Sequence, residues 1–133
     1  MTTTTPHAFD YWIFDLDNTL YPASCRLFQQ VDRRIGQFIA DLLDVPAEEA
    51  RRLQKHYFRT YGTTLRGLMN EHGVDPAPYL AFVHEIDVSV VAPDPQLAAL
   101  LDAAPGRKFV YTNGSARHAD NVLRRLGVEA RFD

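Results

Sequence analysis

Residues 9–20 read FDYWIFDLDNTL, and they join an apolar run to an acidic turn. The first part is aromatic and β-branched, as is typical of a short buried strand in a parallel sheet. The second part becomes polar at once, with Asp15 and Asp17 separated by a single residue. Open α/β sheets bind ligands outside the carboxyl ends of their strands, so we expect both carboxylates to face a ligand site.

A block of helical periodicity follows this first strand. Apolar residues recur every three or four positions from Ser24 to about Leu43, and further helices are expected from Pro46, Thr64 and Asp75. A helix starting at Asp94-Pro95, a strand over 107–112 (RKFVYT) and a helix capped by Ser115 and closed by Gly127 come next.

This order predicts an α/β fold with a Rossmann-like parallel-sheet core and an inserted helical cap. We assign residues 9–20 and 92–133 to the core, 21–91 to the cap and 1–8 to a disordered tail. Two strands alone make a marginal sheet, and a third is expected where the chain reaches Arg131. We therefore expect the core to be incomplete and truncated on its C-terminal side.

Composition limits the classes of function. The 133 residues include 14 Lys and Arg against 17 Asp and Glu, and the scattered basic residues predict no nucleic-acid polymer as partner. No apolar run approaches the ~20 residues of a membrane span, and the first residues lack secretory-signal features. A single cysteine, Cys25, excludes an intramolecular disulfide, so we expect a cytoplasmic location.

Two carboxylates at one strand end can divide the work of phosphate-ester hydrolysis. An ionised Asp can attack phosphorus, while a second Asp protonates the leaving oxygen and then deprotonates the attacking water. Magnesium is the natural counter-charge because it prefers hard oxygen ligands. A bare Asp-x-Asp pair is more typical of a turn before Pro22, but the longer string after a strand reverses this and favours the catalytic interpretation.

A second polar strand end, Thr112-Asn113-Gly114-Ser115, precedes the last predicted helix. One hydroxyl, adjacent backbone amides and a helix N-terminus together suit a phosphate oxygen. An ordinary Asn-Gly turn with Ser115 as N-cap is the alternative. We expect phosphate binding because this strand and the first should end at the same sheet edge.

These stretches carry a family resemblance. DLDNTLYP (15–22) resembles the first motif of the haloacid dehalogenase superfamily, and TNGS (112–115) resembles its second. YGTTLRGL (61–68) and VHEID (83–87) are similar to the cap of its pyrimidine 5′-nucleotidase-like branch. The resemblance runs from about residue 9 to 133 and implies a magnesium-dependent phosphatase whose substrate is a small phosphomonoester, in this branch a nucleoside monophosphate.

The resemblance also implies residue roles. Asp15 is expected to be the nucleophile and a metal ligand, and Asp17 the general acid/base, with its carbonyl on the magnesium. Thr112 and the Asn113 amide are expected to bind the phosphoryl group. The family also uses a later lysine and an acidic pair, and nothing after Thr112 supplies either.

Two alternatives therefore stay open. One is a non-catalytic, truncated module that binds a partner or a phosphorylated ligand. The other is a dehalogenase, which Asp17 disfavours because no oxyanion leaves in that reaction.

Other polar residues have weaker signals. Three residues after the Gly62 break are candidates for substrate contact from a cap loop, namely Thr63, Thr64 and Arg66. A solvated turn with Thr64 as helix cap is the favoured interpretation of them. The histidines lack metal-ligand spacing and are assigned to the surface or to packing; they are His56, His72, His84 and His118.

Overall fold

The computed structural model of the chain describes residues 9–133, so the predicted disordered tail at 1–8 lies outside the described residues. The chain forms two compact units. Among the described residues, one unit contains residues 9–25 together with Val88–Asp133, and the other is Arg26–Asp87. The predicted cap runs instead over 21–91, and the assignment of the units as core and cap stays a prediction.

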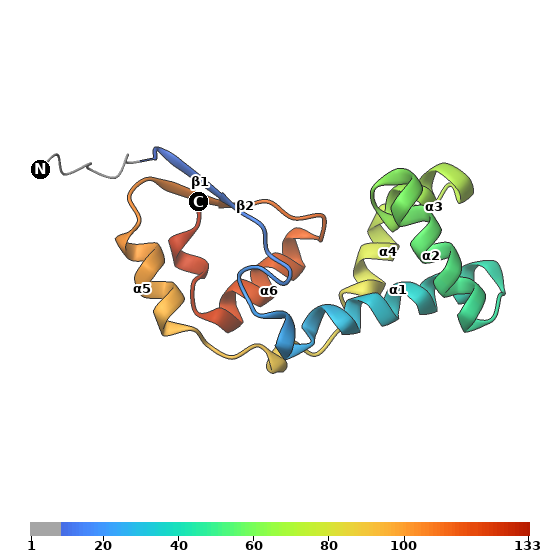
Figure 1. Cartoon of the computed structure of the whole chain (residues 1–133), viewed down its shortest axis with the longest axis horizontal. Helices are drawn as coiled ribbons and strands as arrows, with labels where there is room; N and C mark the ends of the chain where they lie inside the picture. Colours follow the sequence, from blue (N-terminus) through green and yellow to red (C-terminus); the bar gives the residue numbers. More distant parts are fainter. Residues whose placement is uncertain (1–8) are drawn as a thin grey trace, which may run out of the picture. The chain divides into compact units, whose positions relative to one another are not determined.

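The first unit contains a two-stranded parallel sheet. β1 (Tyr11–Phe14) pairs with β2 (Arg107–Val110), and the register aligns Phe14 with Val110. Figure 1 shows both strands running the same way, so that the loops that follow them leave from one end. The predicted α/β class is confirmed at this level: a mostly helical chain with a small parallel sheet.

The predicted burial of the first strand is wrong on one face. Tyr11 and Ile13 are 63% and 74% exposed, whereas the alternating Trp12 and Phe14 are half-buried. Helices α5 (Pro95–Ala103) and α6 (Ala116–Leu126) lie on one side of the strand pair in Figure 1. Because successive side chains in a strand point to opposite faces, cover from one side buries only alternate residues.

The core of the first unit lies beneath the sheet and along α6. The face of α6 that carries Ala119, Val122, Leu123 and Leu126 is buried, as its periodicity predicts. The acidic turn, α5 and the loops add further buried side chains, namely Leu16, Leu20, Tyr21, Val91, Leu101 and Val128. Ser115 caps α6 by accepting a hydrogen bond from the His118 N–H at 3.1 Å.

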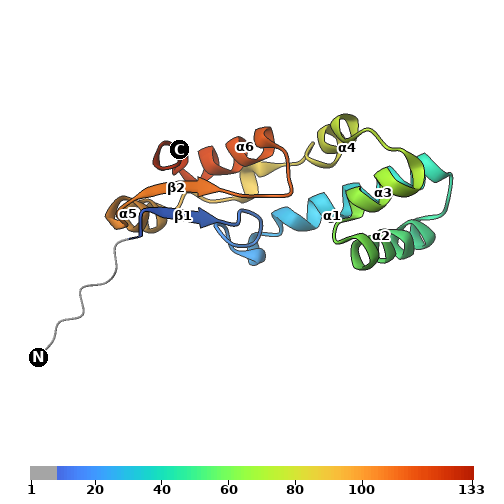
Figure 2. The same ribbon diagram turned by 90° about the horizontal axis from the view of Figure 1, so that it is seen from above.

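The second unit is helical. It contains α1 (Leu27–Leu43), α2 (Ala47–Tyr61), α3 (Thr64–His72) and α4 (Pro76–Val83), which form one group of helices in Figure 2. Their buried apolar side chains form a single core. The buried residues of that core come from all four helices: Val31, Ile39, Ala50, Tyr57, Leu68, Tyr79 and Val83.

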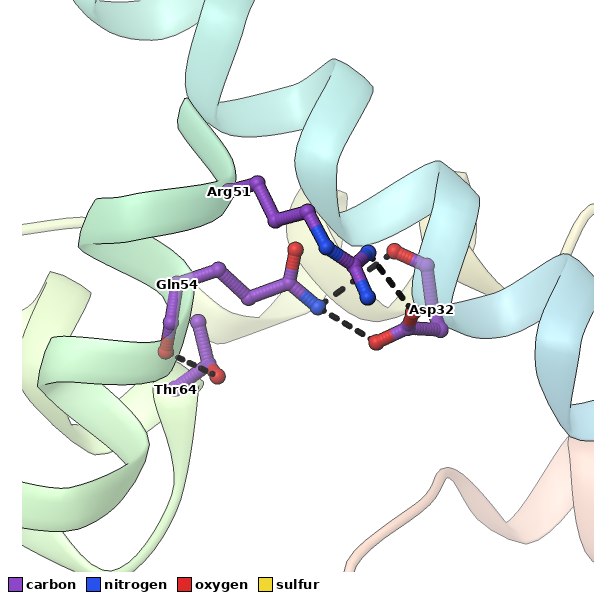
Figure 3. A network of polar contacts seen from close by, with 4 residues as sticks. All are labelled: Asp32, Arg51, Gln54 and Thr64. Atoms are coloured by element: carbon purple, nitrogen blue, oxygen red, sulfur yellow. Dashed lines mark hydrogen bonds and ion pairs between the residues drawn. The ribbon is translucent and has the colours of Figure 1, made fainter. Parts of the chain in front are cut away.

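A polar network also joins three of these helices (Figure 3). Gln54 on α2 is 7% exposed and donates its amide to Asp32 Oδ1 on α1 at 2.7 Å. Arg51 contacts Asp32 Oδ2 at 3.3 Å, and the Thr64 hydroxyl at the start of α3 donates to the Gln54 carbonyl at 3.2 Å. Because buried polar groups need partners, these bonds fix how the three helices pack.

Several predicted element boundaries need correction. α1 begins at Leu27 rather than Ser24, because a 3₁₀ turn at Ala23–Cys25 and a left-handed Arg26 (φ 64°) precede it. β2 ends at Val110 rather than 112, because Thr112 enters a turn in which its hydroxyl accepts the Gly114 N–H. None of the helices among residues 9–133 is long and apolar enough to cross a membrane.

Gly106 sets the entry into β2. Its φ is +102°, and a Cβ at this position would lie 2.4 Å from the Phe9 carbonyl oxygen and 2.8 Å from that of Asp10. The next residue, Arg107, donates its N–H to the Asp10 carbonyl at 2.9 Å. The absence of a side chain therefore allows the two strands to approach at the start of their ladder.

We predict that Gly106→Ala destabilises the protein by about 3 kcal/mol, because it adds a backbone clash to a left-handed conformation. Gly127→Ala is the matched control: its φ is +78° and nothing lies within 4 Å of the added Cβ. That control should cost only about 1 kcal/mol. Urea unfolding of both variants measures the difference, and equal losses would contradict the steric account.

Candidate active site

The pairing of β1 with β2 brings the two predicted polar strand ends to one edge of the sheet. Phe14 and Val110 are register partners, and the Tyr111 N–H donates to the Phe14 carbonyl at 2.9 Å. Asp15 and Thr112 therefore follow two adjacent strand tips. This edge is the position at which parallel α/β sheets hold ligands.

A tight turn presents the acidic residues. The N–H groups of Thr19 and Leu20 donate to the Leu16 carbonyl at 3.2 and 3.0 Å. Asn18 has φ 57°, a left-handed conformation that Asn adopts more readily than most residues. The turn places residues four apart beside each other, so the Thr19 hydroxyl donates to Asp15 Oδ2 at 3.2 Å. Asp15 is itself exposed at the sheet edge.

Asp17 is less exposed and is held from two directions. The Tyr21 hydroxyl donates to its Oδ1 at 2.8 Å, and His118 Nε2 lies 2.9 Å from the same oxygen. The Asp17 side chain is 18% exposed and the His118 side chain only 1%. A carboxylate oxygen can only accept, so Nε2 carries the proton in this contact.

The Tyr21 hydroxyl acts as a hydrogen-bond donor to Asp17. Burial raises the pKa of its hydroxyl far above the usual value near 10, and the hydrogen bond to Asp17 raises it further. The phenol is therefore protonated at neutral pH and can donate to Asp17.

The second strand end is organised as a turn. The Thr112 hydroxyl accepts the Gly114 N–H at 3.1 Å, and Ser115 then caps α6. Within residues 9–133, no hydrogen bond engages the Asn113 N–H. Asn113 is exposed and Thr112 half-buried, so both can reach an anion at this edge.

The oxygen atoms of Asp15 and Asp17 are suitable ligands for magnesium. The Asp15 carboxylate and the Asp17 backbone carbonyl are hard oxygen donors, and magnesium commonly binds proteins through one or two carboxylates while keeping waters and substrate phosphate oxygens. In the part of the chain that the structure describes, no group of three or more His, Cys, Asp or Glu side chains comes together as a metal site. The two aspartates are therefore the residues that would hold the ion here, and the ion would neutralise charge on the phosphate.

Sequence reasoning missed the two residues that hold Asp17. His118 was assigned to the surface or to packing, but it is buried against the candidate acid/base. Its position on the buried face of the helix that follows Thr112 was the available signal. Tyr21 stood in the quoted motif without a role, and its spacing of four from Asp17 becomes informative only once the turn is known.

The three predicted substrate residues belong to the second unit and have structural roles there. Thr63, rather than Thr64, is the N-cap of α3, with its hydroxyl accepting the Arg66 N–H at 3.1 Å. Thr64 is 7% exposed and bonded to Gln54. The Arg66 side chain is exposed.

A pocket of about 410 Å3 opens on α1 and α2, and Thr64 is the one predicted substrate residue that lines it. Its other lining residues are Phe28, Asp32, Ile35, Gln54, Lys55, Phe58 and Arg59.

Comparison with known proteins finds a relative in yeast. No family model matches the chain. The chain is 28% identical to Phosphate metabolism protein 8 of Saccharomyces cerevisiae over 134 aligned positions. The alignment covers 92% of this chain and 41% of that protein, so the chain spans less than half of the relative's length. The similarity therefore extends across both compact units.

We predict that Thr63→Ala destabilises the protein by about 1 kcal/mol, because the α3 N-cap is lost. Thr63→Ser keeps a hydroxyl and should unfold at nearly the wild-type urea concentration. Thr60→Ala, at an exposed position near the end of α2, controls for loss of a threonine methyl and hydroxyl outside a cap. A serine variant as unstable as the alanine variant would contradict the capping role.

Proposed function

We propose that the protein is a magnesium-dependent phosphomonoester hydrolase of the haloacid dehalogenase type, with Asp15 as nucleophile. The observation that carries this proposal is the parallel pairing of β1 and β2 with Phe14 beside Val110. That register puts two carboxylates and a threonine-amide turn at one sheet edge. The similarity to a protein named for phosphate metabolism supports the same class of chemistry.

The proposed reaction has two steps. An Asp15 carboxylate oxygen attacks phosphorus, the bond from phosphorus to the ester oxygen breaks, and Asp17 gives its proton to the departing oxygen. Water then attacks the aspartyl-phosphate and gives a proton to Asp17, so that inorganic phosphate leaves and Asp15 is regenerated. Thr112 and the Asn113 amide bind the phosphoryl oxygens during both steps. The substrate class is a small phosphomonoester, and the cap resemblance favours a nucleoside monophosphate.

A binding module without turnover is the second candidate. It is favoured by one observation: among residues 9–133, no three or more His, Cys, Asp or Glu side chains come together as a group that could hold a metal ion. Such a module would bind a phosphorylated ligand at Thr112 and Asn113 without forming a phosphoenzyme. The same experiment separates the two candidates.

We predict that Asp15→Asn lowers release of phosphate from p-nitrophenyl phosphate at least about 1000-fold, because the covalent route loses its nucleophile. Asp10→Asn is the matched control, an exposed Asp just before β1 rather than just after it, and it should leave turnover unchanged. The protein is expressed from its complete reading frame and assayed with magnesium and with a chelator, which should suppress turnover. Undiminished turnover by Asp15→Asn would exclude the mechanism, and an inactive wild type that binds phosphate would favour the module.

A further inference from the structure

Two donors from separate segments meet on a single oxygen of Asp17. Tyr21 reaches Oδ1 from within the acidic turn, and His118 reaches it from the first turn of α6, 101 residues along the chain. Both side chains are almost fully buried, at 1% exposure each. A carboxylate bonded through one oxygen to two buried donors has its side-chain rotation fixed by them.

We propose that His118 and Tyr21 are positioning residues that hold the Asp17 carboxylate in the orientation needed for proton transfer to and from the reacting oxygens. This inference rests on the proposed function, because it concerns the same site. It adds two residues to which neither the sequence motifs nor the resemblance assigned a role.

The physical basis is the steep dependence of proton transfer on geometry. A general acid must come within hydrogen-bond reach of the departing oxygen, and a misplacement of about 1 Å can reduce the rate about 100-fold. Asp17 directly precedes the left-handed Asn18 in the turn at the sheet edge and is 18% exposed, so its side chain is not enclosed on all sides. The two bonds to Oδ1 restrain the orientation of its carboxylate.

A purely structural role makes a different prediction. If the contact between His118 and Asp17 served only to attach α6 to the acidic turn, its loss would disturb every substrate alike. A positioning role affects only the step in which Asp17 moves a proton. Substrates that differ in their need for a proton therefore separate the two accounts.

The experiment compares two esters by kcat/KM, which reports events up to departure of the leaving group. Glycerol 2-phosphate releases an alkoxide that requires protonation, whereas 2,4-dinitrophenyl phosphate releases a stable anion that does not. We expect His118→Leu to lower kcat/KM about 100-fold for glycerol 2-phosphate. For 2,4-dinitrophenyl phosphate we expect a loss below about threefold, because that ester needs no acid.

Two further variants test the geometry. In His118→Gln an amide N–H replaces Nε2–H at a similar distance from the backbone, so it should restore most of the lost rate on glycerol 2-phosphate. Tyr21→Phe keeps the buried ring and removes the other donor, so it should show the same selectivity between esters to a smaller extent, since His118 remains. Thermal unfolding of each variant identifies any that fail to fold, and the glutamine and phenylalanine variants then carry the test.

The outcomes are distinct. Equal losses for the two esters in folded variants, or no loss for either, would overturn the positioning role while leaving Asp15 as nucleophile intact. Phosphate release that survives Asp15→Asn, or a wild type that hydrolyses neither ester, would overturn the proposed function and the positioning role with it. A selective loss on glycerol 2-phosphate that glutamine rescues would support the inference.

Discussion

The parallel ladder between β1 and β2 is the constraint on which the first unit depends. It joins segments nearly a hundred residues apart, and its register decides that Asp15 and Thr112 follow neighbouring strand tips. Gly106 permits the ladder to start, because a side chain there would meet the carbonyl oxygens of Phe9 and Asp10. A slip of one residue would send alternate side chains to the opposite face and separate the polar ends.

Beyond the ladder, the site is assembled by a local turn and one long-range contact. The turn at 16–20 brings residues four apart close together. The Thr19 hydroxyl therefore bonds to Asp15 and the Tyr21 hydroxyl to Asp17 without help from the rest of the chain. His118 then connects the turn to α6. The result is two carboxylates in different surroundings, Asp15 exposed and Asp17 held by buried donors. Such asymmetry suits groups that perform different steps.

The helical unit has its own apolar core and its own polar network. Contacts within the unit therefore account for how its helices pack. Thr63 and Thr64, which the sequence offered as substrate contacts, stabilise the junction between α2 and α3. Their hydroxyls are engaged in a cap and in a buried bond. Figure 3 shows why polar side chains near a predicted loop need not face a ligand: the Thr64 hydroxyl bonds to the Gln54 carbonyl, and the Gln54 amide bonds to Asp32 on α1.

The sequence by itself determined the kinds of element and the order in which they occur, because helical periodicity, caps and the acidic turn are local properties of residues such as Asp75, Asp94 and Ser115. It also singled out Asp15, Asp17 and Thr112 from their positions after apolar runs. Tertiary structure alone decided that Tyr11 and Ile13 are exposed and that His118 meets Asp17. Burial and contacts between distant residues depend on which elements pack together, and no local pattern encodes a pairing across 101 residues.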